Sequence, residues 1–377
     1  MIYVQHLLGV GHLQRAQQLA AALAQRGFRV ELVTGGMPTA RPPVAGVNLH
    51  QLPPARSADA SVSRLLDADG RDVDTAWQDE RRGRLLELFD RLSPRALITE
   101  TFPFGRRMMR FELVPLLQRA RASDNCLQVI SSIRDILQPK TRPGRNRETC
   151  DLIEAYYDHV LVHADPSLVS LEHSFAEVDR IRDKIAYSGY ICGDGATTTV
   201  ETGAAGEVLV SAGGSDTGLA LLRAAIAARP LTRLKQRHWR ILVSPAIAES
   251  EFQSLRQPAD PNISVERNRS DFSALMQQAG LSISQAGYNT MTDILANRVP
   301  AVVIPFTEAN EIEQTLRARR LQDLGRLVML ESSRLSAATL AAAVDQALDL
   351  DTSLEVDLNG AANSAALIAG WLEATPA

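Results

Sequence analysis

The sequence predicts an α/β protein of two successive domains, each built around a mostly parallel β-sheet. Apolar runs of five to seven residues alternate along the chain with longer stretches of helical periodicity, a pattern typical of parallel sheets. The length of 377 residues suits two domains at roughly 150 residues each. A polar, glycine-rich passage interrupts the alternation near the middle of the chain. We therefore expect two parallel-sheet domains that face each other across a cleft.

The first domain is predicted to span residues 1–190. Its strands are expected at 1–8, 29–34, 47–52, 95–100, 126–133 and 159–164, and its helices at 12–26, 76–92, 106–122 and 145–158. Residues 37–74 are rich in Pro, Ala, Ser and Asp and are predicted to form a long loop. Such loops often bind ligands, although plain sequence variability is the commoner reason for them.

Residues 191–206 are polar and glycine-rich and are predicted to be the linker. The second domain should occupy residues 207–377. Its strands are expected at 207–212, 239–244, 263–267, 281–285, 300–305 and 326–330, and its helices at 216–228, 249–257, 271–279, 289–298, 310–323 and 336–348. A final helix at 357–374 can pack back on the first domain.

Composition excludes several classes of protein. With 45% apolar and 22% charged residues, the chain is unlike disordered, collagen-like or coiled-coil proteins. The net charge of −4 offers nucleic acid no overall attraction, so no nucleic-acid partner is expected. The three lysines are Lys140, Lys184 and Lys235. None of them follows a glycine-rich loop, which excludes a Walker-type P-loop.

The sequence predicts a cytoplasmic protein. Its first residues already have the pattern of a strand, without the basic and apolar segments of a secretory signal. The sequence contains no uninterrupted run of about 18 apolar residues, the length that a membrane-spanning helix needs. Cys126, Cys150 and Cys192 are odd in number and widely spaced, which fits neither a disulfide framework nor a zinc motif.

The first strand leads into a glycine turn, Gly9-Val10-Gly11-His12, and then into a helix. Glycines permit a tight turn and leave helix N–H groups free to meet an anion. Gly11 and His12 should lie at the carboxyl edge of the sheet, where open α/β folds bind ligands. A third glycine of the dinucleotide fingerprint is missing, because residue 14 is Gln. The turn can be purely structural, but the histidine is suited to general-base catalysis.

The second domain repeats this arrangement. Its first strand leads into Gly213-Gly214-Ser215-Asp216 and a helix. The backbone N–H groups of Gly214 and Ser215, with the Ser215 hydroxyl, can hold a phosphate at the helix start. Alternatively, Ser215 or Asp216 simply caps the helix.

Residues 281–299 place polar side chains where a strand ends and a helix begins. Gln285 and Gly287 end the strand, Asn289 and Thr290 start the helix, and Asp293 lies in its first turn. The Asp293 carboxylate can accept two hydrogen bonds from a ribose diol. Its alternative role is an interaction with the helix dipole.

The next strand ends at Pro305-Phe306, and Glu313 and Gln314 begin the following helix. A carboxylate and an amide side by side are suited to the hydroxyls of a sugar ring. Alternatively, Glu313 belongs to a solvated helix face.

Together these motifs resemble the carboxy-terminal domain of glycosyltransferase family 28, which includes the N-acetylglucosaminyltransferase of the lipid-linked peptidoglycan precursor. The matching segments, in chain order, are Gly213-Gly214-Ser215, Ala286-Gly287, Asp293, Arg298-Val299-Pro300, Gln314 and Arg317-Ala318. The resemblance implies a GT-B fold, with two Rossmann-like domains, and a nucleotide-sugar donor, typically UDP-linked, on the second domain.

The resemblance also implies roles for individual residues. Asp293 would contact the ribose and Gln314 the donor sugar, with Glu313 as its neighbour. Ser270-Asp271-Phe272 lies where the family has its base-recognition loop, and Arg269 beside it could reach a phosphate. Gln285, Gly287, Asn289 and Thr290 are grouped with these donor-binding residues.

At the amino end, Gly9-Val10-Gly11-His12 is similar to the family's glycine-rich turn that ends in histidine. The preceding segment, Tyr3-Val4-Gln5-His6-Leu7-Leu8-Gly9, resembles a group of bacterial predicted glycosyltransferases. Two departures stand out. Asp293 replaces the usual glutamate, and the arginine often found after the interdomain strand is missing near Gly189.

The acceptor side is expected at two other strand ends of the first domain. Glu100 ends one strand, and Arg134 and Asp135 end another. All three are acceptor-binding candidates at the carboxyl edge, and one of them could assist His12. An internal Arg134–Asp135 ion pair is an equally good explanation.

Residues 102–111 combine arginines with Phe and Met, which would allow peripheral contact with the inner face of a membrane. Helical spacing, however, places Met109, Leu113, Leu116 and Leu117 on one face, as in an ordinary core. Asp67-Ala68-Asp69 matches the acidic triplet of metal-dependent transferases but lies in the long loop, so no metal site is expected.

We therefore predict an inverting, metal-independent glycosyltransferase. It would move a hexosyl or N-acetylhexosaminyl group from a UDP-linked donor to a lipid-linked or small-molecule hydroxyl acceptor, with His12 as base and no cofactor besides the nucleotide sugar. Two alternatives remain. UDP-sugar hydrolases of nonulosonate synthesis also have a Gly-x-Gly-His turn, and their histidine activates water. A non-catalytic nucleotide-sugar-binding protein would keep only the donor site.

Overall fold

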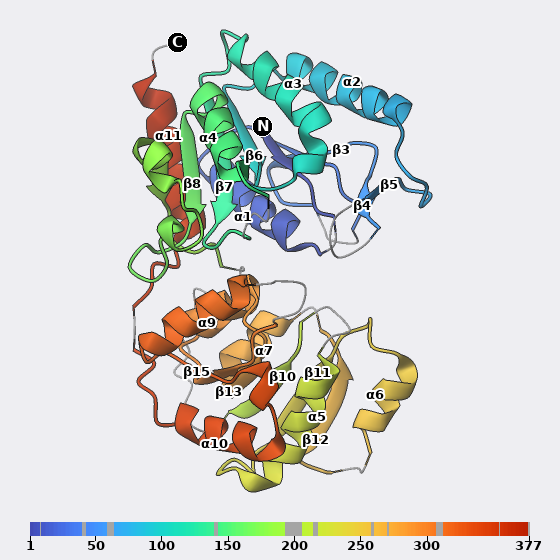
Figure 1. Ribbon diagram of the computed structural model, residues 1–377, viewed down its shortest axis with the longest axis vertical. Helices are drawn as coiled ribbons and strands as arrows, with labels where there is room; N and C mark the ends of the chain where they lie inside the picture. Colours follow the sequence, from blue (N-terminus) through green and yellow to red (C-terminus); the bar gives the residue numbers. More distant parts are fainter. Residues whose placement is uncertain are drawn as a thin grey trace. The chain divides into compact units, whose positions relative to one another are not determined.

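The computed structural model describes residues 1–7, 9–39, 43–58, 64–138, 142–192, 206–213, 218–257, 260–269, 271–306, 312–353 and 355–375. The chain divides into two compact units, each with the expected parallel α/β alternation (Figure 1). Unit 1 comprises Met1–Ile191 and Asn359–Ala377, and unit 2 comprises Cys192–Leu358. The end of the chain thus returns to unit 1. Most of the predicted linker, residues 193–205, lies outside the described residues.

Unit 1 contains a seven-stranded sheet in the order β3-β2-β1-β6-β7-β8-β9, with every neighbouring pair parallel. Its strands are β1 (Ile2–Val4), β2 (Val30–Thr34), β3 (Val47–Gln51), β6 (Ala96–Glu100), β7 (Gln128–Arg134), β8 (His159–His163) and β9 (Ile185–Tyr187). Strand β9 was not predicted, because three residues are too short for a recognisable apolar run. The antiparallel pair β4 (Arg56–Ser57) and β5 (Leu65–Leu66) in the long loop was not predicted either.

The helices of unit 1 are α1 (Gly11–Gln25), α2 (Thr75–Leu92), α3 (Arg110–Arg121), α4 (Arg145–Tyr156) and α11 (Gly360–Ala374). Helix α1 buries Leu13, Ala16, Leu19, Ala20 and Leu23, the spacing of one helix face. Helix α2 begins at Asp74, whose side chain accepts the Trp77 N–H at 2.8 Å. Helix α11 packs against α1, and Trp371 stacks on His159 at 3.7 Å between ring centroids.

Unit 2 contains a six-stranded parallel sheet in the order β12-β11-β10-β13-β14-β15. Its strands are β10 (Glu207–Ser211), β11 (Trp239–Val243), β12 (Ile263–Arg267), β13 (Ala279–Ser284), β14 (Ala301–Val303) and β15 (Val328–Met329). Its helices are α5 (Leu219–Ala228), α6 (Glu249–Leu255), α7 (Phe272–Gln278), α8 (Tyr288–Ala296), α9 (Glu313–Asp323) and α10 (Ala337–Ala347). Within the described residues, each predicted element of this domain has a counterpart.

In both sheets the order in which successive strands are added reverses at one pair of neighbouring strands. This pair indicates where ligands are expected. In unit 1 the order runs outward from β1 to β3 on one side and from β6 to β9 on the other. In unit 2 the corresponding pair is β10 and β13. Open α/β sheets bind ligands beyond the carboxyl ends of such a pair. His12 follows β1 and Glu100 ends β6, whereas Gly213 follows β10 and Gly287 follows β13.

Candidate active site

His12 is the second residue of α1 and is held at the carboxyl edge of the sheet in unit 1. Its Nδ1 lies 3.0 Å from Glu100 Oε1 and 3.1 Å from Thr101 Oγ1. The Glu100 side chain is 2% exposed, whereas that of His12 is 18% exposed. The ionised Glu100 only accepts hydrogen bonds and favours the tautomer with the proton on Nδ1, whereas an Arg15 guanidinium nitrogen 3.1 Å from Nδ1 only donates and favours the other tautomer. In the tautomer that Glu100 favours, the Nε2 lone pair of His12 is the basic position and has no hydrogen-bond partner among the described residues, as a general base requires.

Glu100 remains ionised because it is surrounded by donors. Burial by itself would raise its pKa, but the Arg15 guanidinium that ion-pairs with it holds the pKa of Glu100 well below its usual range. Ser132 of β7 donates to the other carboxylate oxygen at 2.7 Å. Both oxygens of Glu100 thus have hydrogen-bond donors, and its position against His12 is fixed.

The same surroundings keep His12 neutral. Burial, together with the positive charges of Arg106 and Arg15, lowers the pKa of His12 to about 3, although Glu100 acts in the opposite direction. The imidazole is consequently deprotonated at neutral pH.

The backbone beside His12 is strained. Thr101 has a φ of 71° and Arg106 a φ of 57°, in the left-handed region that side chains disfavour, most of all a β-branched one such as Thr101. Each such residue costs about 1–3 kcal/mol and tends to occur at functional sites. Here the conformation of Thr101 accompanies the contact of its hydroxyl with His12. Arg106 donates from Nε to the Gln5 carbonyl at 2.7 Å.

The other acceptor-side candidates lie on the same edge. Gly11 is the first residue of α1, and Arg134 ends β7. Arg134 is half-buried and close enough to Arg106 to lower its pKa, after burial itself. Asp135 is completely buried, so its carboxylate does not face solvent as an acceptor ligand would.

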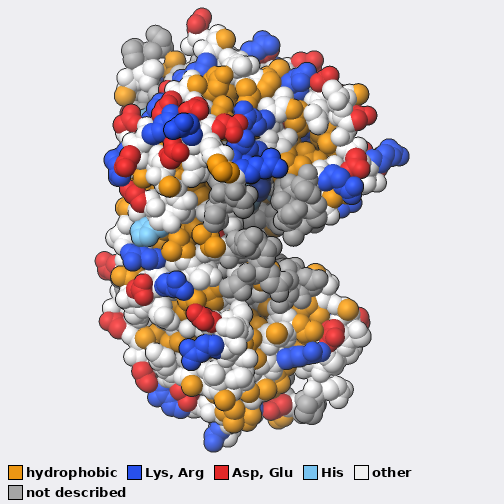
Figure 2. Space-filling model, in the orientation of Figure 1, with side chains coloured by type: hydrophobic (Ala, Val, Ile, Leu, Met, Phe, Trp, Pro, Cys, Tyr) orange, Lys and Arg blue, Asp and Glu red, His pale blue; other side chains and the backbone are white. Residues whose placement is uncertain are grey.

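Most of the apolar side chains of residues 102–111 are buried in unit 1 and are not available for membrane contact. Phe102, Phe104 and Met109 are buried, as are Leu113, Leu116 and Leu117, which confirms the core interpretation. Arg107 and Arg110 both pair with Glu148. Acidic and basic side chains are interspersed over the visible face of unit 1 (Figure 2). Over the described part of the chain, no helix is both long and apolar enough to cross a membrane.

The acidic triplet at residues 67–69 is a structural turn. The Asp67 carboxylate accepts the N–H groups of Asp69 and Arg71 at 2.9 and 2.8 Å, and Asp69 pairs with the Arg71 side chain. Within the described ranges, no cluster of three or more His, Cys, Asp or Glu side chains is arranged to hold a metal.

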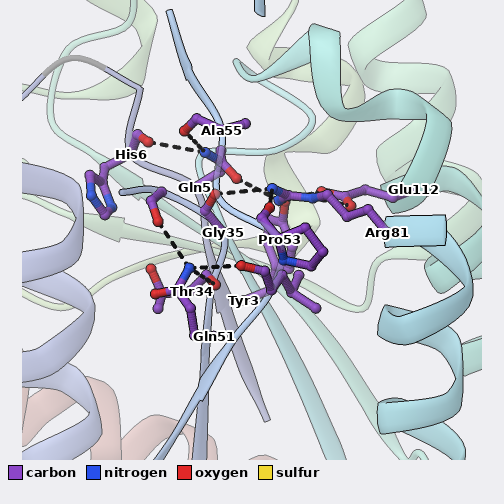
Figure 3. Close-up of polar contacts among 12 residues, drawn as sticks. Tyr3, Gln5, His6, Thr34, Gly35, Gln51, Pro53, Ala55, Arg81 and Glu112 are labelled. Carbon is purple, nitrogen blue, oxygen red and sulfur yellow. Dashed lines mark hydrogen bonds and ion pairs between the residues drawn. The ribbon is translucent and has the colours of Figure 1, made fainter. Parts of the chain in front are cut away.

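A buried polar network supports the loops around the turn between β1 and α1 (Figure 3). Arg81 of α2 and Glu112 of α3 are fully buried and form an ion pair at 2.7 Å. Arg81 also donates to Gln5 Oε1 at 2.6 Å and to the carbonyls of Gly35 and Pro53. The network thus ties the end of β1 to the loops that follow β2 and β3.

Gln5 and the next residue, His6, belong to the segment that resembles bacterial predicted glycosyltransferases. Gln5 donates to the carbonyls of His6 and Ala55, at 3.0 and 3.1 Å, and His6 Nε2 lies 3.0 Å from the Met37 carbonyl. A Cβ on Gly35 would lie 2.0 Å from the Arg81 guanidinium. The segment therefore shapes the loops rather than supplying reactive groups.

In unit 2, Asp293 lies on α8, which begins after Gly287. It is 7% exposed and accepts a hydrogen bond from Ser273 at 2.9 Å. Burial raises the pKa of Asp293 to about 6, against the effect of Ser273. Asn289 and Thr290 are in the first turn of the same helix. Asp293 is therefore a buried hydrogen-bond acceptor whose pKa lies about one unit below neutral pH.

The structure shows that the alternative interpretation of Glu313, as part of a solvated helix face, is wrong. Its side chain is 3% exposed, not solvated, and it pairs with Arg317 at 2.7 Å. Arg317 also donates to the Ala286 carbonyl at 2.8 Å. Arg317 therefore anchors the Ala286-Gly287 turn to α9, and Glu313 holds the Arg317 side chain in place. Its neighbour Gln314 accepts the Phe306 N–H at 3.1 Å, so it is tied to the loop after β14.

The phosphate-side candidates are only partly described. Gly214, Ser215 and Ser270 lie outside the described residues. The Gly213 carbonyl accepts from Asn268 at 3.0 Å, and a Cβ on Gly213 would lie 3.5 Å from Gln285 Oε1. Arg269 does not extend freely toward a phosphate, because Asp271 binds it through two hydrogen bonds and Glu266 through a third.

Sequence reasoning missed several residues that support His12. Arg15 follows it by one helical turn, which is a signal that could have been used. Thr101 was hidden because its role depends on an unusual φ. Ser132 and His163 come from different strands, and their contacts depend on sheet register, which a single sequence does not reveal.

The sequence was compared with family models and with curated proteins. Residues 208–369 match the model of the glycosyltransferase family 28 C-terminal domain. A UDP-N-acetylglucosamine–N-acetylmuramyl-(pentapeptide) pyrophosphoryl-undecaprenol N-acetylglucosamine transferase of Chromohalobacter salexigens is 28% identical over 131 residues, 33% of this chain and 36% of that protein. Its Synechococcus counterpart is 30% identical over 145 residues, covering 38% and 39%. The chain thus spans less than two fifths of these curated relatives.

Solved structures match over nearly the whole chain. The calicheamicin glycosyltransferase CalG4 has a TM-score of 0.62 at 15% identity, covering 99% of this chain and 98% of its own. MurG of Acinetobacter baumannii has a TM-score of 0.58 at 16% identity, covering 98% and 99%. At such identities the likeness concerns the fold. Residues 208–369 therefore form a glycosyltransferase family 28 C-terminal domain, within a chain that has the two-domain GT-B fold.

Proposed function

We propose that this protein is an inverting glycosyltransferase that moves a sugar from a nucleotide donor, most consistently a UDP-sugar, to a hydroxyl acceptor. The family 28 domain supports the transferase class, and the names of the curated relatives support the UDP-linked donor and a lipid-linked acceptor. The observation that carries the proposal is the His12–Glu100 pair, with its neutral imidazole and free Nε2.

The proposed reaction is a single displacement. The acceptor oxygen forms a bond to the anomeric carbon, while the bond from that carbon to the nucleotide diphosphate breaks. The acceptor proton passes to His12 Nε2, and Glu100 stabilises the imidazolium that results. The leaving diphosphate would meet the start of α5, where helix N–H groups favour negative charge. Asp293 would hold the ribose. We propose that no metal takes part, so EDTA should leave turnover unchanged.

The first experiment identifies the donor. Thermal shift across nucleoside diphosphates and nucleotide sugars is expected to single out one base, because ligands that bind the native state raise the melting temperature. With that donor, His12→Ala should reduce turnover by about 10²–10⁴-fold and leave donor affinity within twofold.

His173→Ala is the control, since His173 is exposed and lies outside the site. Near-normal turnover of His12→Ala would refute the base assignment. Free sugar released without any acceptor would instead identify water as the acceptor. Donor binding without turnover would identify a binding protein.

A further inference from the structure

A line of buried polar side chains extends from Glu100 away from His12. Ser132 Oγ lies 2.7 Å from Glu100 Oε2 and 2.8 Å from His163 Nε2, and His163 Nδ1 lies 3.0 Å from Ser188 Oγ. Glu100, Ser132, His163 and Ser188 are each no more than 2% exposed. Side chains of three neighbouring strands, β6, β7 and β8, therefore form one hydrogen-bonded row.

Counting protons gives this row a single direction. The Ser132 hydroxyl has one proton, and the ionised Glu100 can only accept it. His163 Nε2 must then carry a proton and donate to Ser132 Oγ. A neutral imidazole has one N–H, so His163 Nδ1 accepts from the Ser188 hydroxyl. Burial, and after it the charge of Arg15, lowers the pKa of His163 to about 3, in keeping with this neutral form.

The far end of the row is also held in place. Ser188 lies just after β9, and its carbonyl accepts a hydrogen bond from Asn363 of α11 at 2.9 Å. The row is thus anchored at one end by the returning helix and ends at the other on the carboxylate that faces His12.

We propose that His163 is a positioning residue for the candidate base: it aligns Ser132 as a donor to Glu100, and Glu100 thereby holds the His12 proton on Nδ1. The inference rests on the proposed function, which makes His12 the base. His163 itself is far too buried to touch substrate. If it is removed, Ser132 can turn away from Glu100, and the carboxylate charge is left more strongly on the oxygen facing His12.

The consequence is a change in the basicity of His12. The charged groups that face this imidazole are Glu100 of β6, Arg15 of α1 and Arg106 after β6. Substitution at His163 keeps all three residues in the chain and changes the hydrogen bond that Ser132 gives to Glu100. A carboxylate with one donor fewer attracts the imidazolium more strongly, so the pKa of His12 should rise.

The test compares His163→Leu, which has no donor, with His163→Gln, whose amide N–H can still donate to Ser132. Histidine ¹⁵N NMR of the full chain follows the tautomer and titration of His12, assigned with His12→Asn. We expect a His12 titration at higher pH in His163→Leu, and one close to wild type in His163→Gln. Ser132→Ala should shift it in the same way, and the double variant Ser132→Ala/His163→Leu no further.

Kinetics supply the second readout. The kcat of His163→Leu should fall about tenfold, because Glu100 no longer holds the His12 ring in one orientation and this loss outweighs the gain in basicity, while the KM for the donor stays within twofold. His163→Gln should recover most of this loss. An unchanged His12 titration in both His163→Leu and Ser132→Ala would overturn the proposal. Because NMR needs no turnover, a shifted titration in a protein without transferase activity would refute the proposed function and leave the row's role intact.

Discussion

Burial sets the charge of two residues on which the proposed reaction depends. It lowers the pKa of His12 to about 3, together with Arg106 and Arg15, and raises the pKa of Asp293 to about 6. Both shifts favour the neutral form of the side chain. His12 is therefore unprotonated throughout the neutral range, whereas Asp293 changes its charge just below neutral pH. The donor side should consequently be the more sensitive of the two to mild acid.

This difference predicts how donor affinity depends on pH. If Asp293 binds ribose hydroxyls as a carboxylate, protonation below its pKa of about 6 removes the stronger acceptor. The affinity for uridine diphosphate, measured by calorimetry, should then weaken about tenfold between pH 7.5 and pH 5, the factor that linkage gives one unit below the pKa.

Asp293→Asn is the matched control, because the amide has the same shape and does not titrate. The diphosphate itself gains a proton in this range, and the variant measures that contribution separately. The variant should bind more weakly at pH 7.5 and show the smaller pH dependence. Equal pH profiles for the two proteins would contradict the assignment of Asp293.

At the scale of elements, α2 and α3 are joined by an ion pair that water does not reach. Arg81 and Glu112 are both completely buried, and Tyr3 of β1 also donates to the Glu112 carboxylate. A buried pair of this kind adds little net stability over apolar side chains, but the loss of one partner leaves an uncompensated charge. Its contribution here is to fix the loops beside the His12 turn.

We therefore predict that Arg81→Met destabilises unit 1 by about 3–5 kcal/mol, because Glu112 would remain buried without its cation. Urea unfolding followed by hydrogen exchange in peptides of α2 and α3 measures this free energy. Arg84→Met on the same helix should change it by less than about 0.5 kcal/mol, since the Arg84–Glu80 pair is exposed.

The double variant Arg81→Met/Glu112→Gln separates charge from packing. It carries no buried charge, so it should recover part of the stability lost in Arg81→Met. A double variant as unstable as Arg81→Met would mean that packing, and not the uncompensated carboxylate, accounts for the loss.

For the whole molecule, alternation and glycine turns predicted both sheets, and His12 and Glu100 were among the candidates. The register of the strands could not be predicted from the sequence. The contacts from Glu100 to Ser132 and from Ser132 to His163 depend on that register, so they could not be predicted either. The burial of Glu313 was not predicted, because nothing in the sequence distinguishes its buried partner Arg317 from an exposed arginine. Helical periodicity indicates which face of a helix is buried but not which element covers it. For this reason the packing of α11 on the first domain could be given only as one alternative.

The return of α11 to unit 1 depends on a close approach of backbones at its first residue. The Gly360 N–H donates to the Tyr190 carbonyl at 3.0 Å, and the next turn carries Asn363, which donates to Ser188. A Cβ on Gly360 would lie 2.4 Å from the Gly189 carbonyl oxygen. The helix start thus fits against the segment by which the chain leaves unit 1 only because Gly360 has no side chain.

Gly360→Ala should therefore destabilise unit 1 by about 1–3 kcal/mol, the range for overpacking a filled site, and leave uridine diphosphate affinity unchanged because Asp293 lies in unit 2. Gly370→Ala tests the same chemical change on the same helix, where a Cβ meets nothing within 4 Å. There alanine should be neutral or stabilise by up to about 1 kcal/mol. Hydrogen exchange in α1 and α11 distinguishes the two, and equal protection in both variants would refute the role of Gly360.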